Sequence, residues 1–189
     1  DVFKVVESLL NKVFKKFSNK KFLYEKFPRI PYEDAMLKYG TDKPDLRNPL
    51  QIHDLTEIFH REDVKFEIFK KLVKSGSIVR SIITKNTKDK PRSFFDNLDK
   101  WAKSQGASGL AYFTFEKEKN ITAKGPVGKF FSSEALTEIM KITGAKVGDS
   151  IFFSCDKEHN VLQLMSSTRD KIANELDLID HNVFAFCWI

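Results

Sequence analysis

The chain has 189 residues, of which 41% are hydrophobic and 31% are charged, and its formal net charge is +6. This length and apolar content are typical of a globular protein with a buried core, and eight glycines and six prolines are too few for a collagenous or low-complexity protein. No apolar run approaches the roughly 18 uncharged residues that a membrane span needs, so the sequence predicts no membrane partner. The charged N-terminal stretch does not fit a signal peptide, and the two cysteines, Cys155 and Cys187, do not make a disulfide framework. We therefore expect a cytoplasmic location.

The first 60 residues alternate between expected helices and extended segments. Residues 1–17 carry apolar side chains at three- and four-residue spacing, which predicts an amphipathic helix. Prolines keep residues 27–31 extended, and Pro31 and Gly40 suit the start and the cap of a short helix. Residues 50–59 fit either a short strand or a helical turn.

From Ser77 onward, apolar alternation and helix-capping residues give a clearer pattern. The expected strands cover 77–83, 110–115, 151–155 and 183–189, and the expected helices cover 91–106, 132–144 and 161–178. This order fits a parallel α/β unit or a two-layer α+β domain with an antiparallel sheet. The apolar closing segment needs a pairing strand, yet no turn or partner follows it, so we expect the chain to be a fragment.

Positive charge is concentrated between Lys70 and Lys103, a segment with ten basic residues and only three acidic ones. Such a segment can bind a phosphate backbone by releasing counterions, although a lysine-rich surface that only keeps the protein soluble gives the same pattern. The candidate phosphate contacts in this segment are Arg80, Lys85, Lys88, Lys90 and Arg92.

A second charged cluster contains Thr41, Asp42, Lys43, Pro44, Asp45, Leu46 and Arg47. Its charges alternate in sign, so the turn either braces itself by ion pairs or offers Lys43 and Arg47 to an anion. Bracing is the favoured interpretation.

Other motifs predict no chemistry. The segment 124–129 is similar to a phosphate-binding loop but lacks its first glycine and its Ser or Thr. Cys155 and His159 supply too few ligands for zinc, and a buried structural thiol fits Cys155 and Cys187 better. His53, His60 and His181 have no nucleophile in a recognisable elbow and are expected at the surface.

Several segments resemble bacterial-type aspartyl-tRNA synthetases of class II. YGTDKPDLRNP (39–49) is similar to the family stretch YGSDKPDLRNP, with Thr41 replacing the usual serine. FPRIPYEDAMLKYG (27–40) follows the family pattern except that Asp34 replaces a glutamate. Further segments follow in the family's order: GASGLAYFTF (106–115), GPVGKFF (125–131), GAKVGDSIFFSCD (144–156) and FAFCWI (184–189).

The resemblance implies that residues 63–168 form the inserted GAD domain, an α+β domain of two layers with a mostly antiparallel sheet and helices on one face. It implies that residues 1–62, after class II motif 2, and residues 169–189 are catalytic-domain segments. The implied parent enzyme activates L-aspartate with ATP and Mg²⁺, transfers it to tRNA and is a homodimer.

The family's ATP and aspartate ligands lie before or after this chain. We therefore expect no catalytic, cofactor-binding or metal-binding residue in it, no bound cofactor and no activity of the fragment alone. The insertion is expected to be accessory and to face tRNA. The alternative is a structural or protein-interaction module without a nucleic-acid role.

Overall fold

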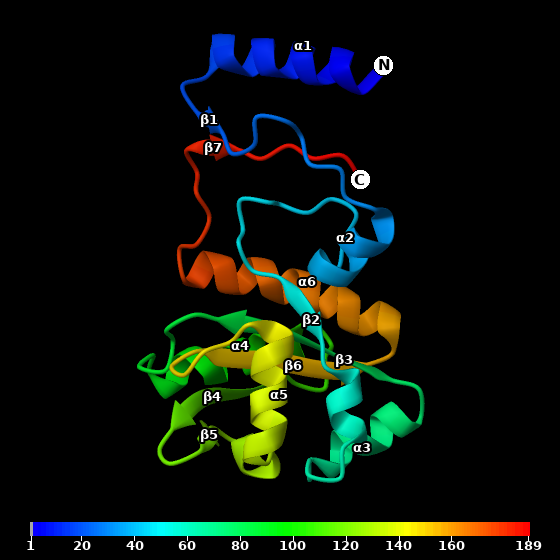
Figure 1. Ribbon diagram of the computed structural model, residues 1–189, viewed down its shortest axis with the longest axis vertical. Coiled ribbons are helices and arrows are strands. Elements are labelled where there is room, and N and C mark those ends of the chain that lie inside the picture. Colours follow the sequence, from blue (N-terminus) through cyan, green and yellow to red (C-terminus); the bar gives the residue numbers. More distant parts are fainter. Residues whose placement is uncertain (1) are drawn as a thin grey trace.

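A computed structural model describes residues 2–189 of the chain (Figure 1). The helices are α1 (Val2–Phe17), α2 (Tyr32–Tyr39), α3 (Glu67–Lys74), α4 (Arg92–Ser104), α5 (Ser133–Thr143) and α6 (Glu158–Glu175), and the 3₁₀ turns are η1 (Thr56–His60) and η2 (Gly128–Phe130). The strands are β1 (Lys21–Phe22), β2 (Ile52–Asp54), β3 (Ile78–Thr84), β4 (Ala111–Lys117), β5 (Ile121–Lys124), β6 (Ser150–Asp156) and β7 (Val183–Phe184).

The larger sheet has five strands in the order β2-β3-β6-β4-β5, and every neighbouring pair is antiparallel. This confirms the predicted α+β class and excludes the parallel α/β alternative. β3 and β6 pair along their whole length, from Ile78 opposite Asp156 to Thr84 opposite Ser150.

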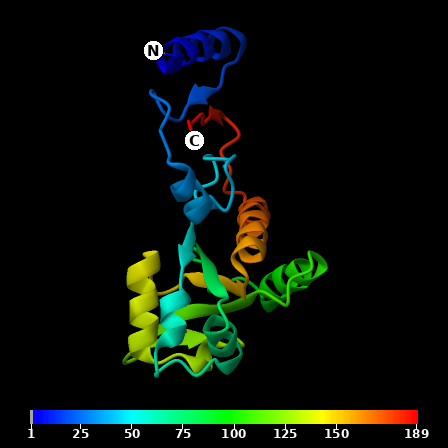
Figure 2. The same ribbon diagram turned by 90° about the vertical axis from the view of Figure 1, so that its right-hand side faces the viewer.

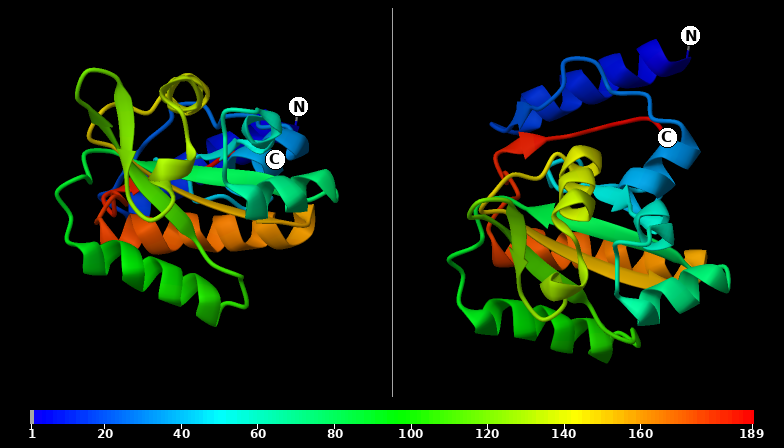
Figure 3. Two further views of the ribbon diagram at one scale, coloured as in Figure 1. Left: turned by 90° about the horizontal axis from the view of Figure 1, so that it is seen from below. Right: turned by 60° about the horizontal axis from the view of Figure 1, so that its bottom comes forward.

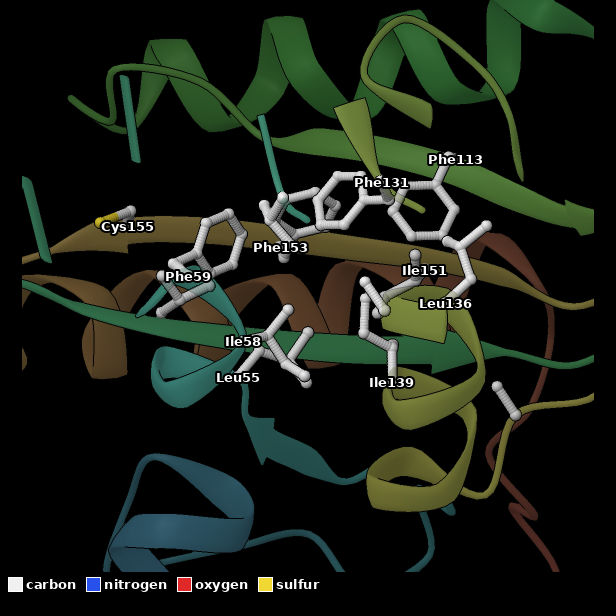
Figure 4. Close-up of a cluster of buried hydrophobic side chains, with 14 of the residues drawn as sticks. Leu55, Ile58, Phe59, Phe113, Phe131, Leu136, Ile139, Ile151, Phe153 and Cys155 are labelled. Carbon is white, nitrogen blue, oxygen red and sulfur yellow. The ribbon is translucent and has the colours of Figure 1, made fainter. Parts of the chain in front are cut away.

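Helices cover both faces of this sheet, which differs from the expected arrangement with helices on one face (Figures 2 and 3). On one face, η1, α3 and α5 pack over side chains such as Phe113 and Phe153 (Figure 4). On the other face, α4 and α6 cover Tyr112 and Phe152. The reason is that the central strands carry large apolar side chains on alternate positions of both faces, so each face needs its own cover.

Most element boundaries follow the local sequence signals. The side chain of Ser132 accepts a hydrogen bond from the backbone N–H of Ala135 and so caps α5, and Gly144 ends this helix in the left-handed conformation. Residues 50–59 contain both alternatives, since β2 and η1 follow each other there. α6 begins at Glu158, before the expected residue 161, and α3 and β5 were not predicted.

The N-terminal and C-terminal segments form a second, smaller layer (Figure 1). β1 and β7 pair in parallel, with Lys21 opposite Val183 and Phe22 opposite Phe184. The closing strand therefore pairs inside a sheet, as its apolar side chains require, but with a strand that precedes it in the chain, and it is shorter than predicted. The ring of Phe14 on α1 lies 4.7 Å from the ring of Phe184, centroid to centroid, which fixes α1 over this strand pair.

None of the helices in residues 2–189 is both long enough and apolar enough to cross a membrane.

Candidate nucleic-acid interface

The loop between β3 and α4 carries three of the predicted phosphate contacts, and buried hydroxyl groups hold it to the sheet. The Thr87 hydroxyl lies 2.7 Å from the Thr84 hydroxyl, and its one hydrogen can be donated to the Ser150 hydroxyl at 2.9 Å or to the carbonyl oxygen of Thr84 at 3.0 Å. The Ser150 hydroxyl in turn lies 3.0 Å from that of Thr114 on β4. These four residues, which we call the hydroxyl chain, connect the loop to β6 and β4 through the protein interior.

Backbone hydrogen bonds fix the same loop from the other side. The N–H of Lys88 donates to the carbonyl oxygen of Gly148 at 3.1 Å, and the N–H of Asn86 donates to the carboxylate of Asp149 at 2.9 Å. Asp149 is itself buried. The backbone is therefore pre-organised, whereas the side chains of Lys85, Lys88 and Lys90 remain exposed.

A cavity of about 470 Å³, which we call the basic groove, lies beside this loop. It is lined by Lys88, Lys90, Arg92, Phe95, Tyr112, Thr114, Lys124, Gly125 and Pro126. Four of these residues are basic and none is acidic. Because a cavity with walls of one charge sign concentrates ions of the opposite sign, this groove suits an anionic ligand.

The second wall of the groove comes from Lys124 at the end of β5 and from Gly125 and Pro126, which follow it. At Gly125 the φ angle is +146°, and a Cβ atom would lie 2.9 Å from the Cα of Phe113. Only glycine therefore allows the segment to pack this closely on β4. Residues 124–129 were too weak a match to predict a phosphate-binding loop from the sequence, but Lys124 lines the same groove as Lys88 and Arg92.

Two of the five predicted phosphate contacts lie outside the groove. Lys85 is exposed but does not line it. Arg80 is buried, with 7% of its side chain exposed, and is ion-paired with Asp54. Since β3 lies between β2 and β6 and is covered by helices on both faces, the Arg80 side chain cannot reach a phosphate at the surface. Its burial and its ion pair therefore remove Arg80 from the candidate phosphate contacts.

The charged turn at residues 41–47 braces itself, as favoured from the sequence. Arg47 donates two hydrogen bonds to the Asp45 carboxylate, at 2.9 Å from Nε and 2.6 Å from Nη2. These bonds lower the pKa of Asp45 despite its partial burial. Lys43 is 86% exposed at its side chain and lies 3.4 Å from Asp42. Thr41, Asp42 and nearby residues of α6 line a separate cavity of about 400 Å³.

Arg169 on α6 holds the end of this turn and the residues that follow it. The sequence did not identify this role. The Arg169 side chain is 2% exposed, and it donates to the carbonyl oxygens of Asp45, Asn48 and Leu50 at 2.8, 2.7 and 2.7 Å. The amide of Asn48 donates back to the carbonyl oxygen of Arg169 at 3.2 Å. No local signal distinguishes Arg169 from a surface arginine, because its carbonyl partners lie about 120 residues earlier in the chain.

The remaining candidates show no reactive arrangement. Burial raises the pKa of the Cys155 thiol to about 11, so this group remains a protonated core side chain near neutral pH. His53 is half-buried, and burial lowers its pKa. Within residues 2–189, no three His, Cys, Asp or Glu side chains cluster closely enough to hold a metal ion.

Comparisons with known proteins agree with the sequence resemblance. The family described as GAD domain matches residues 69–165. Over 189 residues the chain is 75% identical to an aspartate–tRNA(Asp/Asn) ligase of Pelagibacter ubique (strain HTCC1062), a match that covers all of this chain and 32% of that protein. Proteins of the same name from Methylorubrum populi and from Wolbachia pipientis subsp. Culex pipiens are 48% and 50% identical over 190 residues, covering all of this chain and 32% and 31% of those proteins. The chain thus spans about a third of the length of these relatives.

Proposed function

Because this chain belongs to the GAD domain family, we propose that it is the GAD-containing part of an aspartate–tRNA ligase. The observation that carries this proposal is the 75% identity to a protein of that name, which extends over the whole chain and well beyond the GAD match. On this proposal, residues 63–168 are the insertion, and residues 1–62 and 169–189 belong to the catalytic domain on either side of it. The bracing of residues 45–50 by Arg169 supports this arrangement, since it joins the two flanking segments.

The whole enzyme is proposed to activate L-aspartate with ATP and Mg²⁺, to transfer the aspartyl group to tRNA and to act as a cytoplasmic homodimer. By the family resemblance, we expect the groups that bind ATP and aspartate to come from the rest of the enzyme. Catalysis requires these groups to be held together around the reacting atoms. The 189-residue chain is therefore proposed to be an accessory part.

Aspartate-dependent exchange of pyrophosphate into ATP tests whether activation of aspartate needs the rest of the enzyme. We expect exchange by a full-length ligase that contains this chain and no exchange above background by the isolated chain. The isolated chain is checked for folding by its thermal unfolding transition. Exchange by the isolated chain would contradict the accessory role. A full-length protein that shows no exchange would contradict the ligase proposal.

We also propose that the insertion faces tRNA through the exposed side chains of Lys88, Lys90 and Arg92. The support is their placement on one pre-organised loop and helix start, next to a groove without acidic lining residues. Contacts of this kind position an RNA by its phosphates and weaken as salt rises, because bound counterions are released on binding.

Removal of these three charges is expected to weaken tRNA binding by the isolated chain and to reduce its salt dependence. In the variant Lys88→Gln, Lys90→Gln, Arg92→Gln, the slope of log K against log salt should fall by about 1 for each phosphate that is no longer neutralised. Filter binding at several salt concentrations measures this slope. The matched control removes three exposed lysines outside the groove, Lys74, Lys141 and Lys157. Equal slopes in the two triple variants would favour the structural module instead.

A further inference from the structure

We propose that the basic groove holds the sugar-phosphate backbone of an RNA strand between two walls, with Lys88 and Arg92 on one side and Lys124 on the other. This inference rests on the proposed contact with tRNA and specifies where the strand lies. It adds Lys124 and Thr114 to the binding residues, neither of which the sequence identifies. The following contacts, charges and dimensions support it.

The cations of the groove are available to a ligand. Within the described residues, Lys88 and Lys90 form no ion pair with a carboxylate. Arg92 lies 3.2 Å from Asp96 and Lys124 lies 3.9 Å from Glu116, but the two basic side chains are 84% and 79% exposed. Ion pairs at such exposed positions contribute little, so exchanging these carboxylates for phosphates costs little free energy.

The floor of the groove offers a neutral donor. Thr114 lines the groove, and its hydroxyl is the last member of the hydroxyl chain. When Ser150 donates its hydrogen to Thr114, the hydroxyl hydrogen of Thr114 is left for an oxygen atom of a ligand. The neighbouring hydroxyl of Tyr112 already donates to Asp96 at 3.1 Å. Thr114 is therefore the floor group that we assign to a phosphate oxygen.

The start of α4 adds to the positive potential of the same wall. Its N-cap residue, Pro91, makes no side-chain cap, and no acidic residue lies in the first turn. The N-terminal end of this 13-residue helix carries partial positive charge from its backbone N–H groups. Arg92, the first residue of the helix, thus combines its own charge with that of the helix end.

The shape and the residue types favour a strand of phosphates over other anions. A small ion such as inorganic phosphate is held best by donors that converge on one point, whereas these cations come from the β3–α4 loop, the start of α4 and the end of β5 around a space of about 470 Å³. Carboxylates of an acidic protein are recognised best by arginine, which binds them in a bidentate manner. Three of the four cations are lysines, which suit phosphates as point charges.

The comparison of Lys124→Gln with Lys119→Gln tests whether Lys124 binds a phosphate of the RNA strand. Both lysines belong to the β4–β5 hairpin and both substitutions remove one charge, but only Lys124 lines the groove. At about 0.15 M salt, removal of one phosphate-binding charge should weaken tRNA binding by the chain about fivefold, with a salt slope lower by about 1. Lys119→Gln should leave the affinity within about twofold.

Three outcomes have distinct meanings. Equal affinities of the two variants, with the loop triple variant still weakened, would overturn the groove and leave the proposed tRNA contact intact. Failure of the unmodified chain to bind tRNA would overturn both.

A third arm uses backbone amide NMR shifts of Thr114 and Gly125, with Gly144 as reference. We expect a 12-nucleotide RNA to shift Thr114 and Gly125 at lower phosphate concentration than inorganic phosphate does, and the reverse order would make the groove a small-anion site.

Discussion

Replacement of Arg169 by methionine is expected to lower the free energy of unfolding by about 3 kcal/mol or more. The guanidinium group is fully buried and donates to three backbone carbonyls of residues 45–50. Methionine fills much of the same space but donates nothing, so these carbonyls lose their partners inside the protein. Each buried polar group left without a partner costs about 1–3 kcal/mol.

Urea unfolding of the chain measures this loss, and the neighbouring aspartate provides a control. Asp170 lies 3.6 Å from Arg169, but its side chain is 58% exposed, so Asp170→Asn should cost less than about 1 kcal/mol. In Arg169→Met, hydrogen exchange of the amides in residues 45–50 should also accelerate, because the turn is no longer tied to α6. If the two variants lost the same stability, the brace would not have the role that its hydrogen bonds indicate.

The sequence predicted the larger sheet well because its strands alternate regularly. In β3, Ile78 and Ile82 face one cluster of buried residues and Val79 and Ile83 face the other, as expected. The helix caps at Ser132 and Gly144 were equally local signals. Features of this kind depend on neighbours a few residues away, and a sequence displays them directly.

Features that depend on distant pairing were missed. β5 is four residues long with polar residues on alternate positions, and only its pairing with β4 identifies it as a strand. β7 pairs with β1 over two residues, although the apolar run from residue 183 to 189 predicts a longer strand. That helices cover both faces of the sheet was readable in principle from adjacent residues such as Phe152 and Phe153, whose side chains point in opposite directions.

The candidate interface likewise combines features that the sequence predicted with features that depend on distant parts of the chain. The charge between Lys70 and Lys103 is evident in the sequence, and Lys88, Lys90 and Arg92 lie together at one groove as a short segment must. Arg80 has the same charge but stands on a central strand, so its burial depends on the sheet order. Lys124 joins the groove through the β4–β5 hairpin and the close packing at Gly125, which local sequence patterns do not report.

The substitutions Gly40→Ala and Gly144→Ala are expected to differ greatly in cost although the two backbones are alike. Both glycines follow a helix with φ 69° and ψ 14°. Alanine in this left-handed conformation costs about 1–2 kcal/mol at either position. At Gly144 a new Cβ atom would meet nothing within 4 Å, so the cost should stop there.

At Gly40 the Cβ atom would lie 2.6 Å from the carbonyl oxygen of Leu162 and 3.0 Å from Cβ of Ser166. Because these atoms belong to α6, α2 must move away from that helix, and we expect about 2 kcal/mol beyond the cost at Gly144, as for an overpacked core. Urea unfolding of both variants gives the difference directly. Equal losses would mean that α2 does not press on α6. A clear excess for Gly40→Ala, together with the effect of Arg169→Met, would show that α6 is the common support on which the segment 32–50 is seated.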